Sequence, residues 1–149
     1  MEDRQQLLEQ YRAMRAEMLA AIGGLSDAEM TERTIDGWSV KDHLAHIALW
    51  DDIRAQEVER ISAGHHSAWR MTGEQDAAFN AIGYDLRREL PLDQVRWELK
   101  ASRARLLRAI EQATDRGLEP LIYGEAGLTS GHEAEHAAWI RKWRERKQS

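Results

Sequence analysis

Four histidines stand at spacings that could place them around one metal ion. His43 and His46 lie in one predicted helix, and His132 and His136 lie four residues apart near the end of the chain. Two imidazoles at that spacing on a helix are about 5–6 Å apart at Cβ, which lets both bind one ion. A third imidazole from a facing helix would complete a three-nitrogen site with one coordination position open. The residues therefore raise the hypothesis of a catalytic type of metal site.

The helix that must position the first histidines is predicted from the N-cap Ser39 to about Ala63. With residues placed about 100° apart and His46 at zero, the apolar side chains nearest to it are Leu49, Trp50, Ile53 and Ile61. An imidazole in the middle of an apolar face is costly unless it has a partner. His43 lies on the same face, so the periodicity alone does not choose between His43 and His46.

The second histidine pair is predicted to open the last helix. Ser130 and Glu133 have the spacing of a capping box, and the helix runs from there to about Arg146. One face of it holds His132, His136, Trp139, Ile140 and Trp143. We interpret His65 and His66, which follow the previous histidine helix, as solvated loop residues.

The remaining elements are also helical. Apolar residues recur every three or four positions over Arg4–Ile22 and Leu92–Thr114, and a thinner apolar face runs over Gly73–Arg88. Capping-box spacings at Ser26 and Thr72 mark two further helix starts. We predict an all-α fold in which residues 1–149 form a single domain. It is a four-helix bundle with a long, partly helical crossover between helices 2 and 3.

The composition excludes several classes of function. A net charge of −5 gives no basic surface for nucleic acid, so no nucleic-acid partner is expected. No apolar run approaches the ~20 residues that span a bilayer, and the first residues lack the apolar core of a signal peptide. We therefore expect a cytoplasmic protein without a membrane partner. The chain has no cysteine, so a small molecule would have to bring the sulfur of any thiol chemistry.

Residues 38–47, Trp-Ser-Val-Lys-Asp-His-Leu-Ala-His-Ile, resemble the helix-two signature of the DinB-like (DinB/YfiT-type) superfamily. In that signature a Trp-Ser/Thr start is followed eight residues later by a metal-binding histidine, an offset that selects His46 over His43. The pair His132 and His136 resembles the one that completes the family's three-histidine site. The resemblance covers nearly the whole chain and implies a divalent metal held by His46, His132 and His136.

Relatives in this superfamily imply two kinds of function. Some are transferases and isomerases that use bacillithiol, mycothiol or glutathione together with a divalent metal. The ClbS/DfsB branch includes a protein that protects its producer from a genotoxic metabolite, and the long crossover and the sequence around Trp50 and Asp51 resemble that branch. The resemblance also implies a homodimer.

The first hypothesis is a metalloenzyme for small-molecule substrates. Zinc or nickel would occupy the site, since imidazole suits both, and a low-molecular-weight thiol is the expected co-substrate. The reaction is a thiol-dependent transfer or isomerisation, or a metal-assisted hydrolysis in detoxification. The alternative is a metal-free binding or self-resistance protein of the ClbS/DfsB type, and a third possibility is a purely structural dimer.

Other residues near the predicted site receive no definite role from the sequence. Trp50, Trp139 and Trp143 share the histidine faces and form either core packing or the aromatic wall of a pocket. Asp51 and Glu57 are the nearest acidic candidates for a general acid or base. No catalytic residue is assigned from these positions, and no acidic partner of the histidines is chosen among Asp42, Glu133 and Glu135.

Overall fold

The computed structural model describes residues 2–34, 36–119, 128 and 131–148. Its elements, in chain order, are α1 (Glu2–Ile22), α2 (Asp27–Thr31), α3 (Val40–Ser62), α4 (Gly73–Arg87), α5 (Leu92–Gln112), the 3₁₀ helix η1 (Arg116–Leu118) and α6 (His132–Gln148). The described residues form no strand beyond one isolated bridge between Arg33 and Ser39. The predicted all-α fold is confirmed, whereas the single domain over residues 1–149 stays a prediction.

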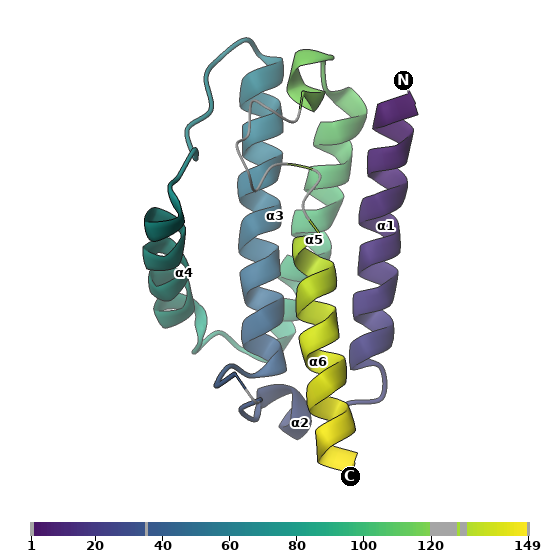
Figure 1. The fold of residues 1–149 in the computed structure, drawn as a ribbon, viewed down its shortest axis with the longest axis vertical. Helices are drawn as coiled ribbons and strands as arrows, with labels where there is room; N and C mark the ends of the chain where they lie inside the picture. The colour runs from purple at the N-terminus through teal and green to yellow at the C-terminus, as the bar shows by residue number, and fades with distance from the viewer. Residues whose placement is uncertain (1, 35, 120–127, 129–130, 149) are drawn as a thin grey trace.

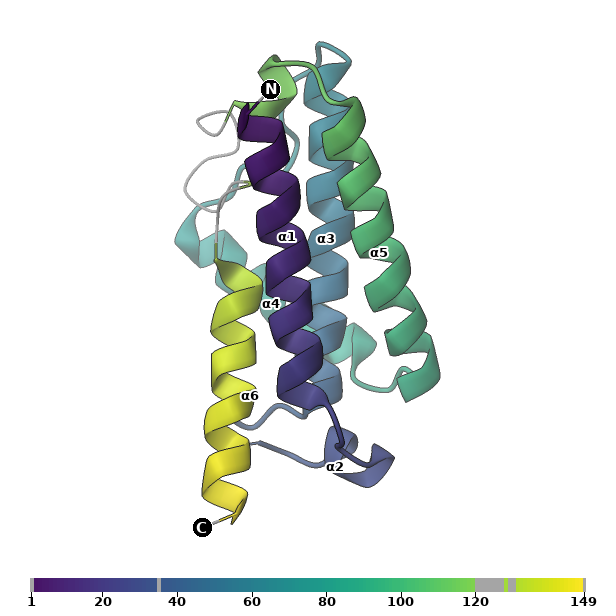
Figure 2. The same ribbon diagram turned by 90° about the vertical axis from the view of Figure 1, so that its right-hand side faces the viewer.

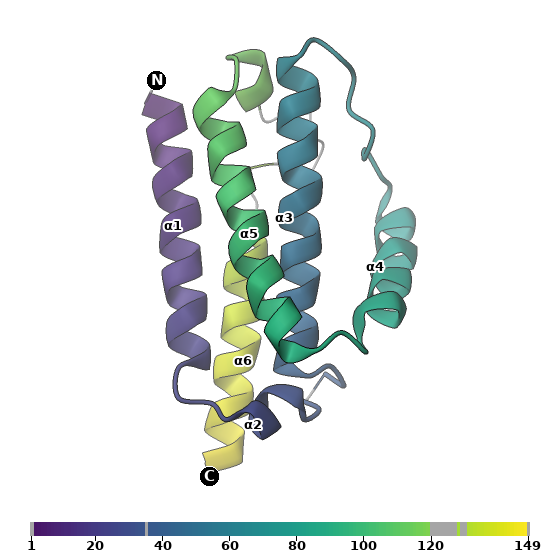
Figure 3. The same ribbon diagram turned by 180° about the vertical axis from the view of Figure 1, so that it is seen from behind.

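Four long helices, α1, α3, α5 and α6, pack lengthwise against one another (Figures 1 and 2). Helix α3 packs along α5 and α1 along α6, while contacts of α1 with α5 and of α3 with α6 close the arrangement. Helices α3 and α5 run in the same direction, and α1 and α6 run in the opposite one (Figure 1). The chain must therefore return along the bundle between α3 and α5, and the return carries α4 outside α3 (Figure 3).

Capping boxes define three of the helix starts. Ser26, Ser39 and Thr72 each accept a hydrogen bond from the backbone N–H three residues later, and the side chain of that later residue accepts from the N-cap N–H in return. These three predicted helix starts are confirmed. The fourth predicted box depends on Ser130, which lies outside the described residues.

The apolar core forms two clusters, one toward each end of the bundle. One cluster gathers around Met18, Leu44, Val95 and Ile140. The other gathers around Tyr11, Val58, Leu106 and Ile110. In sequence position, a polar side chain lies between the two clusters in α1, α3 and α5, and another lies at the start of α6. Arg103 of α5 is one of these residues, and together they form a polar layer of the bundle.

That layer is an ionic network to which each long helix contributes one residue: Arg15 from α1, Asp51 from α3, Arg103 from α5 and Glu133 from α6. Arg103 contacts both Asp51 oxygens (3.1 and 3.2 Å) and Glu133 (2.8 Å). Arg15 contacts Asp51 (3.1 Å) and Glu133 (2.7 Å). The guanidinium groups also donate to the carbonyl oxygens of Leu99 and Tyr11. The network therefore links all four long helices to one another at one level along the bundle.

The crossover helix α4 packs on the outer side of α3. A Cβ atom added at Gly83 would lie 3.1 Å from Cδ2 of Leu49, so the missing side chain lets the two helices approach closely. Lys41 of α3 donates from Nζ to the carbonyl oxygens of Arg88 (2.8 Å) and Leu90 (2.9 Å), just after α4 ends. Among the described helices, none is long and apolar enough to cross a membrane.

Candidate metal centre

Three histidine side chains from two helices converge at one point. Nε2 of His132 lies 2.9 Å from Nε2 of His46 and 3.2 Å from Nε2 of His136. One nitrogen from each of the three residues lies within 4.8 Å of those of the other two. Ligands about 2.0–2.1 Å from a tetrahedral zinc ion are separated by about 3.3 Å, so these separations fit three ligands of one ion. The cluster could hold a divalent metal.

The electrostatic environment keeps these imidazoles uncharged at neutral pH. Burial lowers the pKa of His46 to about 4, that of His136 to about 3 and that of His132 to about 2. The positive charge of Arg54 adds to the shifts of His46 and His132, and repulsion between neighbouring histidine rings, were they protonated, lowers the pKa of all three. A neutral imidazole keeps a lone pair on one nitrogen, which is the form that binds a metal. The donor set therefore fits a divalent ion in chemistry as well as in distance.

A fourth histidine, His43, contacts the cluster through His136. His43, which is 2% exposed, places Nδ1 2.7 Å from Nδ1 of His136. Its other nitrogen, Nε2, lies 2.9 Å from Oδ2 of Asp36. Burial lowers the pKa of His43, and the nearby Asp36 carboxylate opposes that shift. The sequence placed His43 on the correct face but assigned it no role, and Asp36 was not considered.

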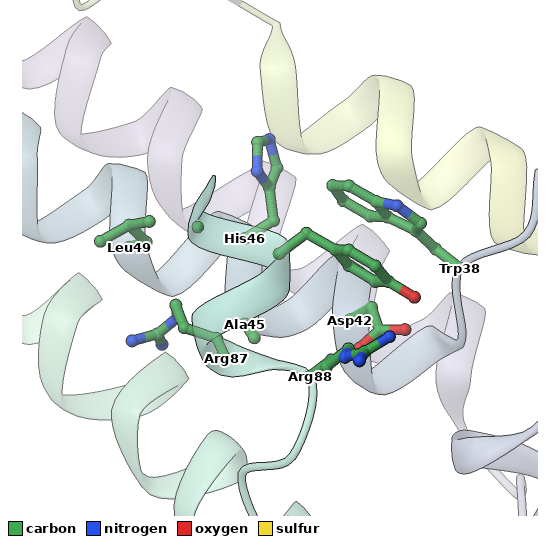
Figure 4. A pocket seen from close by; sticks show the side chains of 9 residues that line it. Trp38, Asp42, Ala45, His46, Leu49, Arg87 and Arg88 are labelled. Atoms are coloured by element: carbon green, nitrogen blue, oxygen red, sulfur yellow. The ribbon is translucent and has the colours of Figure 1, made fainter. Parts of the chain in front are cut away.

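An aromatic pair covers the side of the cluster that faces α4. The ring of Trp38 lies 5.4 Å from the rings of His43 and His46, and it stacks on Tyr84 of α4 with 5.1 Å between centroids and 4° between planes. A small pocket between α3 and α4 opens beside them. Figure 4 labels His46 and Trp38 there, together with Arg87, the last residue of α4, and Arg88, which follows it. The lining of the pocket comprises Trp38, Asp42, Ala45, His46, Leu49, Gly83, Tyr84, Arg87 and Arg88. Because Tyr84 stands outside the histidine helices, their periodicity gave no sign of it.

Of the three tryptophans named from the sequence, Trp50 lies beside the histidines. Its ring centroid is 6.4 Å from that of His132, and its Nε1 donates to Oδ1 of Asn80 at 2.9 Å. Trp143 is buried in the same apolar cluster as Met18, and Trp139 is 47% exposed. In the described part of the chain, neither Trp139 nor Trp143 makes a ring contact with a histidine.

The acidic side chains considered from the sequence have other partners. Asp51 and Glu133 belong to the ionic layer, and Asp42 accepts from the backbone N–H of Ser39 at 2.9 Å. Glu57 binds Arg60, Ser67 and the backbone N–H of Ala68. Glu135 is exposed on α6. These contacts give none of the five a role as general acid or base.

Arg54 is a cation beside the cluster that the sequence reading overlooked. Its Cζ lies 5.7 Å from the ring centroid of Trp50, and its charge contributes to the lowered pKa of His46 and of His132. Arg54 makes no ion pair within 4 Å with any described carboxylate, unlike Arg15 and Arg103 in the ionic layer. It follows His46 by eight residues and Trp50 by four, so the helical period could have placed it on this face.

His65 and His66 are exposed in the loop after α3, as the sequence predicted. They are absent from the group of side chains that could hold a metal in the described residues. They therefore serve as natural control positions for substitutions at the cluster.

Comparison with known proteins agrees with this fold. The sequence profile of the DinB superfamily matches residues 10–140. The crystal structure of an uncharacterised protein from Escherichia coli UTI89 is similar, with a TM-score of 0.77 at 16% sequence identity. The similarity covers 97% of this chain and 94% of that one, and it concerns the fold alone. No curated protein matches the chain.

Proposed function

Because the chain belongs to the DinB superfamily, we propose that His46, His132 and His136 bind one divalent metal ion and that the protein is a small-molecule metalloenzyme. The observation that carries the proposal is the convergence of three Nε2 atoms, two of them 2.9 and 3.2 Å from the third. Zinc and nickel both suit an all-imidazole site, and the ligands do not discriminate between them.

Three neutral ligands leave a coordination position for a substrate atom, as in catalytic sites. When bound, the metal would supply a Lewis acid that favours the deprotonated form of a thiol or a water molecule. The chain's own residues supply the surroundings. Trp38 and Trp50 lie against rings of the cluster and limit the access of water to it.

We favour a thiol-dependent transfer or isomerisation over hydrolysis. Arg54 offers a positive charge that makes no close ion pair with a described carboxylate, and such a charge favours an anionic ligand such as a thiolate or a carboxylate. The chain has no cysteine, so the thiol would be a small molecule of the bacillithiol, mycothiol or glutathione type. A cytoplasmic location and a homodimer remain part of the proposal, and light scattering after size-exclusion chromatography tests the second.

Metal content is the first test. Untagged protein would be measured by plasma mass spectrometry beside the double variant His132→Ala/His136→Ala and the matched control His65→Ala/His66→Ala. We expect about one zinc or nickel per chain in the wild type and the control, and a loss of metal in the site variant. No metal in the wild type, even after incubation with zinc or nickel, would contradict the metalloenzyme. The metal-free binding protein would then be the function to pursue, by quenching of tryptophan fluorescence.

A cobalt-substituted protein separates the two reactions. Cobalt(II) bound to a thiolate absorbs in the near ultraviolet through sulfur-to-metal charge transfer. Addition of glutathione, bacillithiol or mycothiol should produce such a band with at least one of them if the protein uses a thiol. A cobalt protein whose spectrum responds to none of the three would contradict thiol chemistry and favour hydrolysis.

A further inference from the structure

A continuous chain of polar contacts leads from the surface to the cluster. It runs from Oδ2 of Asp36 to Nε2 of His43 (2.9 Å), and from Nδ1 of His43 to Nδ1 of His136 (2.7 Å). It ends at Nε2 of His136, which lies 3.2 Å from Nε2 of His132. Each ring in this chain uses both of its nitrogens, so the protonation of one nitrogen determines what the other can do.

The chain has a fixed starting point. A carboxylate only accepts hydrogen bonds. Oδ1 of Asp36 accepts from the backbone N–H of Trp38 at 3.1 Å and from the hydroxyl of Thr34. Oδ2 therefore remains for His43, whose Nε2 must carry the hydrogen. The tight turn at Gly37, where φ is +88°, places the carboxylate in this position.

The direction of every later hydrogen bond follows from that first one. A neutral imidazole has one N–H, so a His43 that donates from Nε2 can only accept at Nδ1. His136 must then donate from its own Nδ1 to span the 2.7 Å contact. Its Nε2 consequently carries the lone pair and faces the cluster.

We propose that Asp36 and His43 are positioning residues that hold His136 in the tautomer with Nε2 free to bind the metal. The inference rests on the proposed metal site and deepens it. A metal-bound histidine whose second nitrogen donates to a fixed partner is held in orientation and is more basic. Trp38, packed on the rings of both His43 and His46, restricts the movement of the two imidazoles.

Burial supports a role beyond filling space. His43 is 2% exposed, in a core whose neighbouring positions are Val40, Leu44 and Ile47. An apolar side chain would fill this place without the cost of burying a polar ring. The imidazole is satisfied only because Asp36 and His136 bind its two nitrogens.

The proposal can be tested by measuring the zinc affinity of three variants in competition with a chromophoric chelator. His43→Phe fills the site but accepts nothing, and we expect about 10–100-fold weaker binding. His43→Asn can place its Oδ1 where Nδ1 stood, so it should keep affinity within a few-fold of the wild type. His66→Phe is the control for the loss of a histidine and should change nothing.

Asp36→Asn provides a test outside the core. If the amide oxygen keeps the contacts with Trp38 and Thr34, the NH₂ group faces His43 and forces it to accept at Nε2. His43 then donates from Nδ1 to His136, which is left with its hydrogen on Nε2, toward the cluster. We expect this nearly isosteric change to weaken zinc binding by about tenfold or more, with an unchanged circular-dichroism spectrum.

Nitrogen-15 NMR of the chelator-treated protein measures the tautomer directly and needs no metal. We expect the hydrogen of His136 on Nδ1 in the wild type and on Nε2 in Asp36→Asn. A wild-type His136 protonated on Nε2 would overturn the inference. So would wild-type zinc affinity in Asp36→Asn and His43→Phe, or an equal loss in His43→Asn and His43→Phe. Failure of the proposed function is a different result, namely no zinc binding by the wild type.

Discussion

Arg103 donates a hydrogen bond to each carboxylate oxygen of Asp51, at 3.1 and 3.2 Å, and so joins α5 to α3 midway along the bundle. Asp51 is 1% exposed and Arg103 about 6%. Arg15 and Glu133 complete the network, which therefore balances two positive with two negative charges between the apolar clusters. The residue after His132 is Glu133, so this ionic layer also fixes the first turn of α6, where the cluster begins.

Removal of one member of the ionic layer should destabilise the protein strongly. Asp51→Ala leaves the buried guanidinium of Arg103 and the largely buried one of Arg15 with one carboxylate, and a loss of about 3–5 kcal/mol in the free energy of unfolding is expected. Urea unfolding followed by circular dichroism measures it. The matched control is Glu59→Ala, which breaks the 3.1 Å pair with Arg105, where the side chains are 49% and 38% exposed. It should cost less than about 1 kcal/mol. Equal losses in the two variants would contradict the role given to the layer.

Lowering the pH below about 6.5 should destabilise the chelator-treated protein. Burial lowers the pKa of His46 to about 4, and those of His132 and His136 further, from the usual value of about 6.5. Between pH 6.5 and 4 the unfolded chain therefore binds protons that the folded protein does not. The free energy of unfolding should therefore decrease as the pH is lowered through this window, by up to about 1.4 kcal/mol per pH unit for each histidine.

Urea unfolding of chelator-treated protein at pH 7 and pH 5.5 measures this slope. His132→Phe should have a shallower slope than the wild type, because the buried titrating ring is gone. His65→Phe should keep the wild-type slope, since the replaced ring is exposed in both states. A wild-type stability that is equal at the two pH values would count against neutral, buried imidazoles.

Metal should raise the melting temperature of the wild type and not that of a ligand variant. A ligand present at 100 times its dissociation constant stabilises the folded state by about 2.7 kcal/mol. For a domain of this size that corresponds to a shift of roughly 5–11 °C. Differential scanning fluorimetry with zinc and with nickel, before and after a chelator, provides the measurement. His46→Ala should lose most of the shift, and a full shift in that variant would exclude His46 as a ligand.

Arg54 should matter for anionic ligands more than for stability. Arg54→Gln removes the positive charge beside Trp50 while retaining polarity, and the affinity of the cobalt protein for the thiol that binds it should fall by about tenfold or more. Zinc affinity should not fall, because a cation near the site opposes metal binding. Arg12→Gln, on the exposed α1–α5 pair with Glu111, is the control with the same change of charge. Equal effects of the two variants would mean that only net charge matters.

Local sequence determined the helices and the three converging histidines. Helix starts follow from the capping boxes at Ser39 and Thr72, and helix faces follow from the 3.6-residue period. His132 and His136 face the same way because they are four residues apart, and the family signature pointed to His46. These features depend on neighbours within one or two helical turns, so they can be read without knowledge of the fold.

Only the tertiary structure decided which groups surround the histidines. The period could not separate His43 from His46, because both face inward; their distances from α6 show that His46 joins the cluster and His43 stands behind His136. Tyr84 comes from the crossover. Asp51, a candidate acid from the sequence, instead belongs to a network with three other helices. Such pairings depend on how far each helix is shifted and rotated against its neighbours. That arrangement is set by packing between residues far apart in the chain, which no local spacing encodes.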